Sequence, residues 1–195
     1  RLKISELSPV RDSFMYRSAS PIGIQDAMAA VSLRLKRSGV SEARLEAELL
    51  LRHVLNLADR ASFFALTDPL LTPQQLENME GLLKRREQRE PLPYILRNHE
   101  FYGITLEVSP AVLIPRPETE GLVDEALDWI KNRAGFGKPV TVVDVGVGSG
   151  CIAIALAKHS VAATIYGTDV SLPAITVAKS NLLRHGLQER IKLFY

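Results

Sequence analysis

The stretch from Val140 to Gly150 constrains this chain most, because a short β-branched strand runs there directly into three closely spaced glycines. It reads Val-Thr-Val-Val-Asp-Val-Gly-Val-Gly-Ser-Gly, and the apolar run Cys151 to Ala157 follows with the composition of a buried helix. A strand, a glycine turn and a helix in this order form the first nucleotide-binding corner of a doubly wound sheet. We therefore predict an α/β, Rossmann-like domain with a ligand at this corner.

The residues after the corner continue the same pattern. Ala163 to Thr168 reads as a second buried strand, Pro173 to His185 as a helix that Gly186 ends, and Ile191 to Phe194 as a third strand. Right-handed crossovers make such strands parallel. An open sheet of this type normally holds ~2 to 4 strands more, so we expect residues 116–195 to be the first part of a truncated domain.

Residues 20–90 have apolar positions at helical spacing, which predicts a small all-α bundle. Its helices are expected to begin near four capping residues, Ser20, Ser41, Asp59 and Thr72. Residues 1–19 lack periodicity and are expected to be a mobile leader. The cations Lys84, Arg85, Arg86 and Arg89 alternate with glutamates; we interpret them as a solvated helix face, with contact to an acidic partner as the alternative.

Two prolines at Pro91-Leu92-Pro93 stop the helical pattern and predict a domain boundary. We expect residues 91–115 to be a linker with a β-hairpin, in which a strand from Glu100 to Val108, bent at Gly103, pairs with Ala111 to Ile114. A helix should follow from Pro117. Carboxylates in its first turn, Glu118 among them, are equally explained by the helix dipole and by a site.

The spacing of the corner favours one ligand class over another. A dinucleotide fingerprint would place its third glycine at position 151, where this chain has Cys151. Asp144 would repel a pyrophosphate but suits the ammonium group of S-adenosylmethionine, and Asp169 suits the ribose hydroxyls of either ligand. The residues favour the methyl donor, while a dinucleotide and a purely structural turn remain open.

Composition and charge exclude several other classes of protein. The net charge of +2 and the balanced charges after Leu96 give no basic face for direct nucleic-acid binding. The longest apolar run is far too short for a membrane span, and one cysteine fits the cytoplasm, with an organelle as the alternative. The four histidines stand far apart, so we expect no metal site.

Four motifs together resemble one family, the release-factor glutamine methyltransferases (HemK/PrmC), over about residues 22–195. They are Pro91-Leu92-Pro93-Tyr94-Ile95-Leu96, Glu100-Phe101-Tyr102-Gly103, Val112-Leu113-Ile114-Pro115-Arg116-Pro117-Glu118-Thr119-Glu120, and Asp144 to Ala157. The resemblance implies a helical domain that recognises a release factor, a hairpin linker and a class I methyltransferase domain. The implied reaction moves a methyl group from S-adenosylmethionine to the glutamine side-chain nitrogen of a Gly-Gly-Gln loop.

The resemblance also assigns site residues. The cofactor would be bound by Asp144, Gly146, Val147, Gly148, Ser149 and Gly150, with Asp169 on the ribose; Phe101 and Glu118, near the mouth, are weaker assignments. The family usually has Thr where this chain has Val147, so a hydroxyl contact is lost there. Its Asn-Pro-Pro-Tyr motif lies beyond Tyr195, so no catalytic residue is expected within this chain.

Two other functions stay open from the sequence. The same scaffold methylates adenine amines of nucleic acids in other enzymes, and a chain without the substrate-holding motif could bind cofactor or partner without turnover. The expected partner is a peptide-chain release factor, and we expect a monomer.

Overall fold

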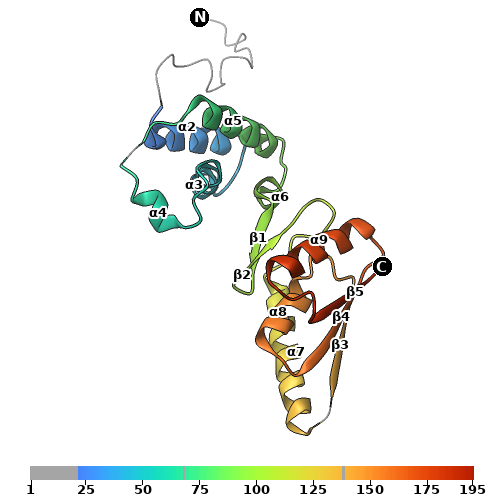
Figure 1. The fold of residues 1–195 in the computed structure, drawn as a ribbon. Helices are drawn as coiled ribbons and strands as arrows, with labels where there is room; N and C mark the ends of the chain where they lie inside the picture. Colours follow the sequence, from blue (N-terminus) through green and yellow to red (C-terminus); the bar gives the residue numbers. More distant parts are fainter. Residues whose placement is uncertain (1–21, 68, 138) are drawn as a thin grey trace, which may run out of the picture. The chain divides into compact units, whose positions relative to one another are not determined.

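The computed structural model describes residues 22–67, 69–137 and 139–195, and divides the chain into two compact units, Arg1–Leu96 and Arg97–Tyr195 (Figure 1). Each unit has a hydrophobic cluster of its own. The predicted leader 1–19 and the predicted cap at Ser20 lie outside the described residues. The functional roles that the sequence suggested for the domains remain predictions.

The first unit is helical. Its described helices are α2 (Ile24–Arg37), α3 (Ala43–Val54), α4 (Arg60–Phe64), α5 (Pro73–Glu87) and α6 (Leu92–Leu96). Helices α2, α3 and α5 bury their apolar stripes against one another, with Leu35, Leu50 and Leu83 fully enclosed. The predicted capping box is present, since Thr72 Oγ1 accepts from the Gln75 amide at 3.2 Å and Gln75 Oε1 accepts from the Thr72 amide at 2.9 Å.

Helix α6 shows that the helical pattern resumes directly after Pro91, where the two prolines were expected to stop it. The amides of Tyr94 and Ile95 both donate to the Pro91 carbonyl. A proline in the first turn needs no N–H partner, so Pro93 is compatible with the start of a helix as well as with the end of one. Ile95 is 2% exposed and packs in the core of the first unit.

The cationic cluster of α5 is only partly a solvated face. Arg86 is 15% exposed and its guanidinium pairs with Glu46 of α3 at 2.6 Å. Arg85 pairs with Glu90, while Lys84 is 63% exposed and lies 3.8 Å from Glu80. The expectation of a solvated face therefore fits Lys84 and is wrong for Arg86, which joins two helices.

The second unit contains a parallel sheet in the predicted β-α-β-α-β order. Its elements are β1 (Asn98–Phe101), β2 (Ile104–Glu107), α7 (Glu118–Gly135), β3 (Val140–Val145), α8 (Cys151–His159), β4 (Ala163–Thr168), α9 (Leu172–Arg184) and β5 (Ile191–Phe194). The strand order is β3-β4-β5, and the β3–β4 register runs from Val140 opposite Ala163 to Val145 opposite Thr168. The α/β fold class is thus confirmed.

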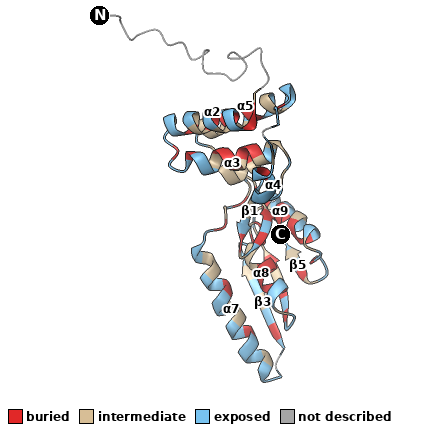
Figure 2. Ribbon diagram, turned by 90° about the vertical axis from the view of Figure 1, so that its left-hand side faces the viewer, coloured by how far each residue is buried: buried red, intermediate tan, exposed pale blue. Residues whose placement is uncertain are grey.

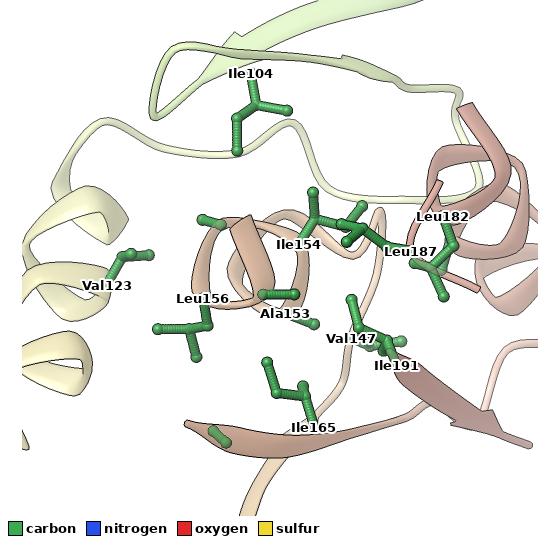
Figure 3. Close-up of a cluster of buried hydrophobic side chains, with 14 of the residues drawn as sticks. Ile104, Val123, Val147, Ala153, Ile154, Leu156, Ile165, Leu182, Leu187 and Ile191 are labelled. Atoms are coloured by element: carbon green, nitrogen blue, oxygen red, sulfur yellow. The ribbon is translucent and has the colours of Figure 1, made fainter. Parts of the chain in front are cut away.

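One face of this sheet carries the core of the unit. Inward residues of the strands meet α8, whose central turn is wholly buried, and Figure 3 shows Ile165 beside Ala153 and Ile191 beside Val147. The alternate residues face outward, and Val145 is 82% exposed. Helix α7 is mostly exposed, pale blue in Figure 2, and fully buries only Val123 and Ile130. The predicted buried helix after the glycines is therefore the central helix of this layer.

The predicted hairpin exists, but its turn lies elsewhere. Strands β1 and β2 pair antiparallel, with Phe101 opposite Ile104, around a two-residue turn at Tyr102 and Gly103. Both turn residues have positive φ, 53° and 66°, as a tight hairpin turn requires. Residues 111–114, expected to form the second strand, are not a strand. A glycine read as a bend was in fact the reversal point.

Candidate functional site

The corner between β3 and α8 is a tight turn that only glycine tolerates at three positions. Gly146, Gly148 and Gly150 have φ of 80°, 54° and 83°. A side chain at position 146 would meet nothing within 4 Å. Glycine is therefore needed there for the positive φ and not to avoid a steric clash. Open space therefore lies beside the first glycine of the turn.

Four amide donors of the turn already have partners. Those of Gly146 and Val147 both donate to the Thr168 carbonyl at 2.8 Å, and that of Gly150 donates to Val147 at 2.8 Å. The Gly148 amide donates to Asp169 Oδ2 at 3.0 Å. Pyrophosphate binds such turns through amide donors, and these four are already engaged within the protein.

The acceptors, in contrast, are available. Asp144 Oδ2 is buried at the end of β3 and has no hydrogen-bond partner among the described residues. Burial raises the pKa of the Asp144 carboxyl, the Ala153 amide opposes this shift by donating to it, and the negative charge of Asp169 raises the pKa further. A cationic donor placed beside Asp144 would relieve both the missing bond and the repulsion.

Asp169 directly follows β4 and joins the turn to the next loop. Its Oδ1 accepts from the Ser171 amide at 2.8 Å, and its Oδ2 accepts from Gly148. A carboxylate has about four acceptor positions, so each oxygen keeps capacity for a hydroxyl donor. Asp169 is therefore held in a fixed orientation and keeps acceptor capacity for a ligand.

Val147 faces the core and not the open side of the turn. It is 3% exposed, and its Cγ2 lies 2.8 Å from where a side chain on Gly167 would begin. Figure 3 shows it among Ile191 and the other core residues. The lost hydroxyl noted from the sequence thus concerns a buried position. Gly167, which sequence reasoning missed, is needed for this close approach.

The two weaker assignments lie in different surroundings. Phe101 is 1% exposed and packs in the core of the second unit, while Glu118 is exposed at the start of α7. The neighbouring Glu120 has the structural contact instead, since its Oε1 accepts from the Tyr102 amide at 2.8 Å. Nothing here places Phe101 or Glu118 beside a ligand, and their role stays a prediction.

Ser149 and Asn181 complete the buried polar groups of the corner. The Ser149 hydroxyl is buried without a hydrogen-bond partner among the described residues. Asn181 of α9 is 0% exposed and its Nδ2 donates to the Ser149 carbonyl at 2.9 Å. The sequence carried one signal for Asn181, a polar residue on the apolar stripe of its helix, between Ala178 and Leu182.

The remaining reactive side chains have packing roles. Burial raises the pKa of the Cys151 thiol, which favours the uncharged form over a thiolate. His99 Nε2 and His185 Nε2 lie 3.1 and 2.9 Å from backbone carbonyls of Pro115 and Thr105. Within the described ranges no group of three or more metal-ligating side chains comes together, and no helix is long and apolar enough to cross a membrane.

Taken together, the acceptors of the corner fit a ligand that brings its own donors. Two carboxylates and the buried Ser149 hydroxyl lie at a turn in which the amides of its three glycines and of Val147 are already bonded. The ammonium and ribose hydroxyls of an amino-acid-bearing nucleoside such as S-adenosylmethionine match this set.

Two family models match this chain, one in each of its two units. The PrmC N-terminal domain family matches residues 26–96, and the ribosomal protein L11 methyltransferase (PrmA) family matches residues 122–195. A release factor glutamine methyltransferase of Geobacter sulfurreducens is 46% identical over 160 residues, covering 82% of this chain and 53% of that protein. One of Dictyoglomus turgidum is 40% identical, covering 88% of this chain and 58% of that protein.

These matches confirm the resemblance that the motifs carried, and this chain spans about half the length of the curated relatives it matches. Among solved structures, the N-terminal domain of human METTL16 in complex with SAH has a TM-score of 0.39 at 23% identity. That match covers 57% of this chain and 43% of that chain, and the likeness is too low to add to the fold described above.

Proposed function

We propose that this relative of the release-factor glutamine methyltransferases binds S-adenosylmethionine at the glycine corner and takes part in methylating the glutamine of a release-factor Gly-Gly-Gln loop. The observation that carries the proposal is the excess of unpaired acceptors at the corner, above all the buried Asp144 Oδ2. The relatives named release factor glutamine methyltransferase support the choice of reaction and substrate.

Each proposed site residue has a defined task. Asp144 would accept from the ammonium group of the methyl donor, and Asp169 would accept from its ribose hydroxyls. Gly146 and Gly148 keep the backbone bare so that the ligand approaches closely, while Ser149 and Gly150 fix the start of α8. Val147 contributes its backbone only, because its side chain lies in the core.

The chemistry that the bound cofactor supplies is an electrophilic sulfonium methyl group. An amide nitrogen is a weak nucleophile, so the contribution of the protein is to hold the reacting groups in line, which is worth about 7–11 kcal/mol in well-oriented reactions. A rigid corner serves this purpose: the Gly148 amide donates to Asp169 Oδ2, and the neighbouring Ser149 carbonyl accepts from Asn181 Nδ2.

The test is a methylation assay with the full-length protein, a release factor and S-adenosylmethionine, read by the mass of the Gly-Gly-Gln peptide. The wild-type protein should add one methyl group. Asp169→Ala should weaken cofactor binding by about tenfold or more, because it removes hydrogen bonds to a charged acceptor. Glu125→Ala, which changes an exposed carboxylate of α7, should leave binding unchanged.

An unmodified release factor would contradict the proposal. Methylation of adenine in a nucleic acid added to the same assay would instead support the alternative substrate. Cofactor binding without any turnover would support a binding protein.

A further inference from the structure

The side-chain amide of Asn181 is buried and hydrogen-bonded through both its oxygen and its nitrogen. Asn181 is 0% exposed, and its side-chain amide makes three hydrogen bonds: Oδ1 accepts from the Glu107 amide at 2.6 Å, while Nδ2 donates to the carbonyls of Glu107 and Ser149, each at 2.9 Å. Both Nδ2 hydrogens are thereby engaged. The three partners are backbone groups of Glu107 and Ser149, which lie far apart in the sequence. The buried amide therefore fixes the distance between these two segments.

The second observation is what Asn181 does for the hairpin. Glu107 is the last residue of β2, and the side-chain amide of Asn181 takes both its backbone donor and its backbone acceptor, as a neighbouring strand would. Ser180 adds a bond from its hydroxyl to Glu107 Oε2 at 2.6 Å. The end of the hairpin is therefore held by two consecutive residues of α9.

The third observation is what Asn181 does for the glycine turn. The peptide between Ser149 and Gly150 is held on both sides, because its carbonyl accepts from Asn181 and its amide donates to Val147 at 2.8 Å. The peptide that contains the Gly148 amide is held separately by Asp169. Without Asn181 the Ser149 carbonyl would lose its partner in a buried place. Gly150, which lacks a side chain, would restrain this peptide less than any other residue would.

From these contacts we propose that Asn181 is a positioning residue for the cofactor corner, which locks the Ser149–Gly150 peptide to the end of the hairpin so that the turn is preformed for its ligand. This proposal rests on the proposed function, since it names a further residue for the same site. Asn181 itself does not touch the ligand and acts through the Ser149 carbonyl.

Neighbouring positions of α9 provide matched variants for the test. Asn181→Asp keeps the size and the acceptor to Glu107 but loses both donors, and Asn181→Ser removes the reach to Ser149 without adding charge. Ser180→Ala loosens the same hairpin residue without touching the turn. All are made in the full-length protein.

Three measurements are needed: the Kd for S-adenosylmethionine by calorimetry, the KM for the release factor at saturating cofactor, and hydrogen exchange of the Gly148 and Gly150 amides without cofactor. Both Asn181 variants should weaken cofactor binding by about tenfold, leave the KM for the release factor unchanged and speed exchange at Gly150. Ser180→Ala should keep the wild-type values.

Unchanged cofactor affinity in a folded Asn181 variant would overturn the proposal. So would equal weakening by Ser180→Ala, since the hairpin would then be responsible, or failure of both Asn181 variants to fold, since Asn181 would then serve general stability. If the wild-type protein does not bind the methyl donor, the proposed function fails. The exchange rates at Gly148 and Gly150 then decide alone whether Asn181 orders the turn.

Discussion

At the scale of single residues, Asp144 lowers the stability of the folded protein when no ligand is bound. Asp144 is half-buried with an unpaired, enclosed Oδ2, and the pKa of its carboxyl is raised by burial and by the charge of Asp169. A raised carboxyl pKa means that the folded protein binds this proton more tightly than the unfolded chain does. The folded state therefore loses stability as pH rises through the raised pKa, and the full cost is present above that pKa.

Asp144→Asn should accordingly stabilise the protein without cofactor at neutral pH, by about 1 kcal/mol, or about 2–4 °C in Tm. The gain over wild type should shrink as pH falls through the raised pKa of Asp144, because the wild-type carboxyl becomes neutral there. Thermal unfolding between acid and neutral pH measures this, and the same variant should bind S-adenosylmethionine more weakly. Equal pH dependence of the two proteins would contradict the account.

The same scale shows which site residues a sequence can reveal. Glycines and aspartates at fixed spacing around Val140–Gly150 could be predicted because the requirement for them is local: a positive φ, or a carboxylate at the end of a strand. Gly167 could not, and Asn181 was marked only as a polar residue on an apolar stripe, because each matters through a contact with a segment far away in the chain. The inward side chain of Val147 likewise follows from how the turn closes on β4.

At the scale of elements, helices α2 and α5 are joined by ion pairs as well as by apolar packing. Arg34 of α2 is 14% exposed and lies between two carboxylates of α5, at 2.7 Å from Glu80 and 2.8 Å from Glu87. Its guanidinium donates four hydrogen bonds to them. Because Glu80 is nearly buried, removing the cation would leave a carboxylate without its main partner.

Arg34→Met should therefore destabilise the first unit by about 3 kcal/mol, since it strands buried negative charge while keeping much of the apolar stem. Lys84→Met is the matched control, because Lys84 approaches the same Glu80 only at 3.8 Å and is 63% exposed; we expect about 0–1 kcal/mol. Urea unfolding followed by helical circular dichroism compares the two variants. Similar decreases in the free energy of unfolding of both variants would show that the buried ion pairs of Arg34 contribute no more to stability than the exposed pair of Lys84.

Helices marked by caps and apolar stripes could be predicted from the sequence, whereas helix α6 and the position of the hairpin turn could not. Capping at Asp59 and Thr72 and the apolar stripes located α4 and α5 because caps and stripes are properties of a few neighbouring residues. Helix α6 was missed because proline stops one helix and starts another equally well. The hairpin was misplaced because Tyr102, not a glycine or asparagine, occupies the first positive-φ position of its turn.

At the scale of the whole molecule, the question is where the helical unit ends. Sequence composition placed the boundary at Pro91, but the structure divides the chain after Leu96, where the match to the PrmC N-terminal domain family also ends. The six residues between include Ile95, which is 2% exposed in the core of the first unit. Helix α6 is therefore part of the helical unit.

A fragment of residues 22–96 should therefore fold with a cooperative thermal transition, whereas a fragment of residues 22–90 should lose most of it. Removing a buried isoleucine side chain costs about 2–5 kcal/mol, which is comparable with the ~3–5 kcal/mol that a single core of this size supplies. The fragment of residues 22–96 carrying Ile95→Ala separates the loss of this side chain from the loss of the helix, and should fall between the two in Tm. Equal melting temperatures for the two wild-type fragments would place the boundary at Pro91, because α6 would then add nothing to the core on which the helical unit depends.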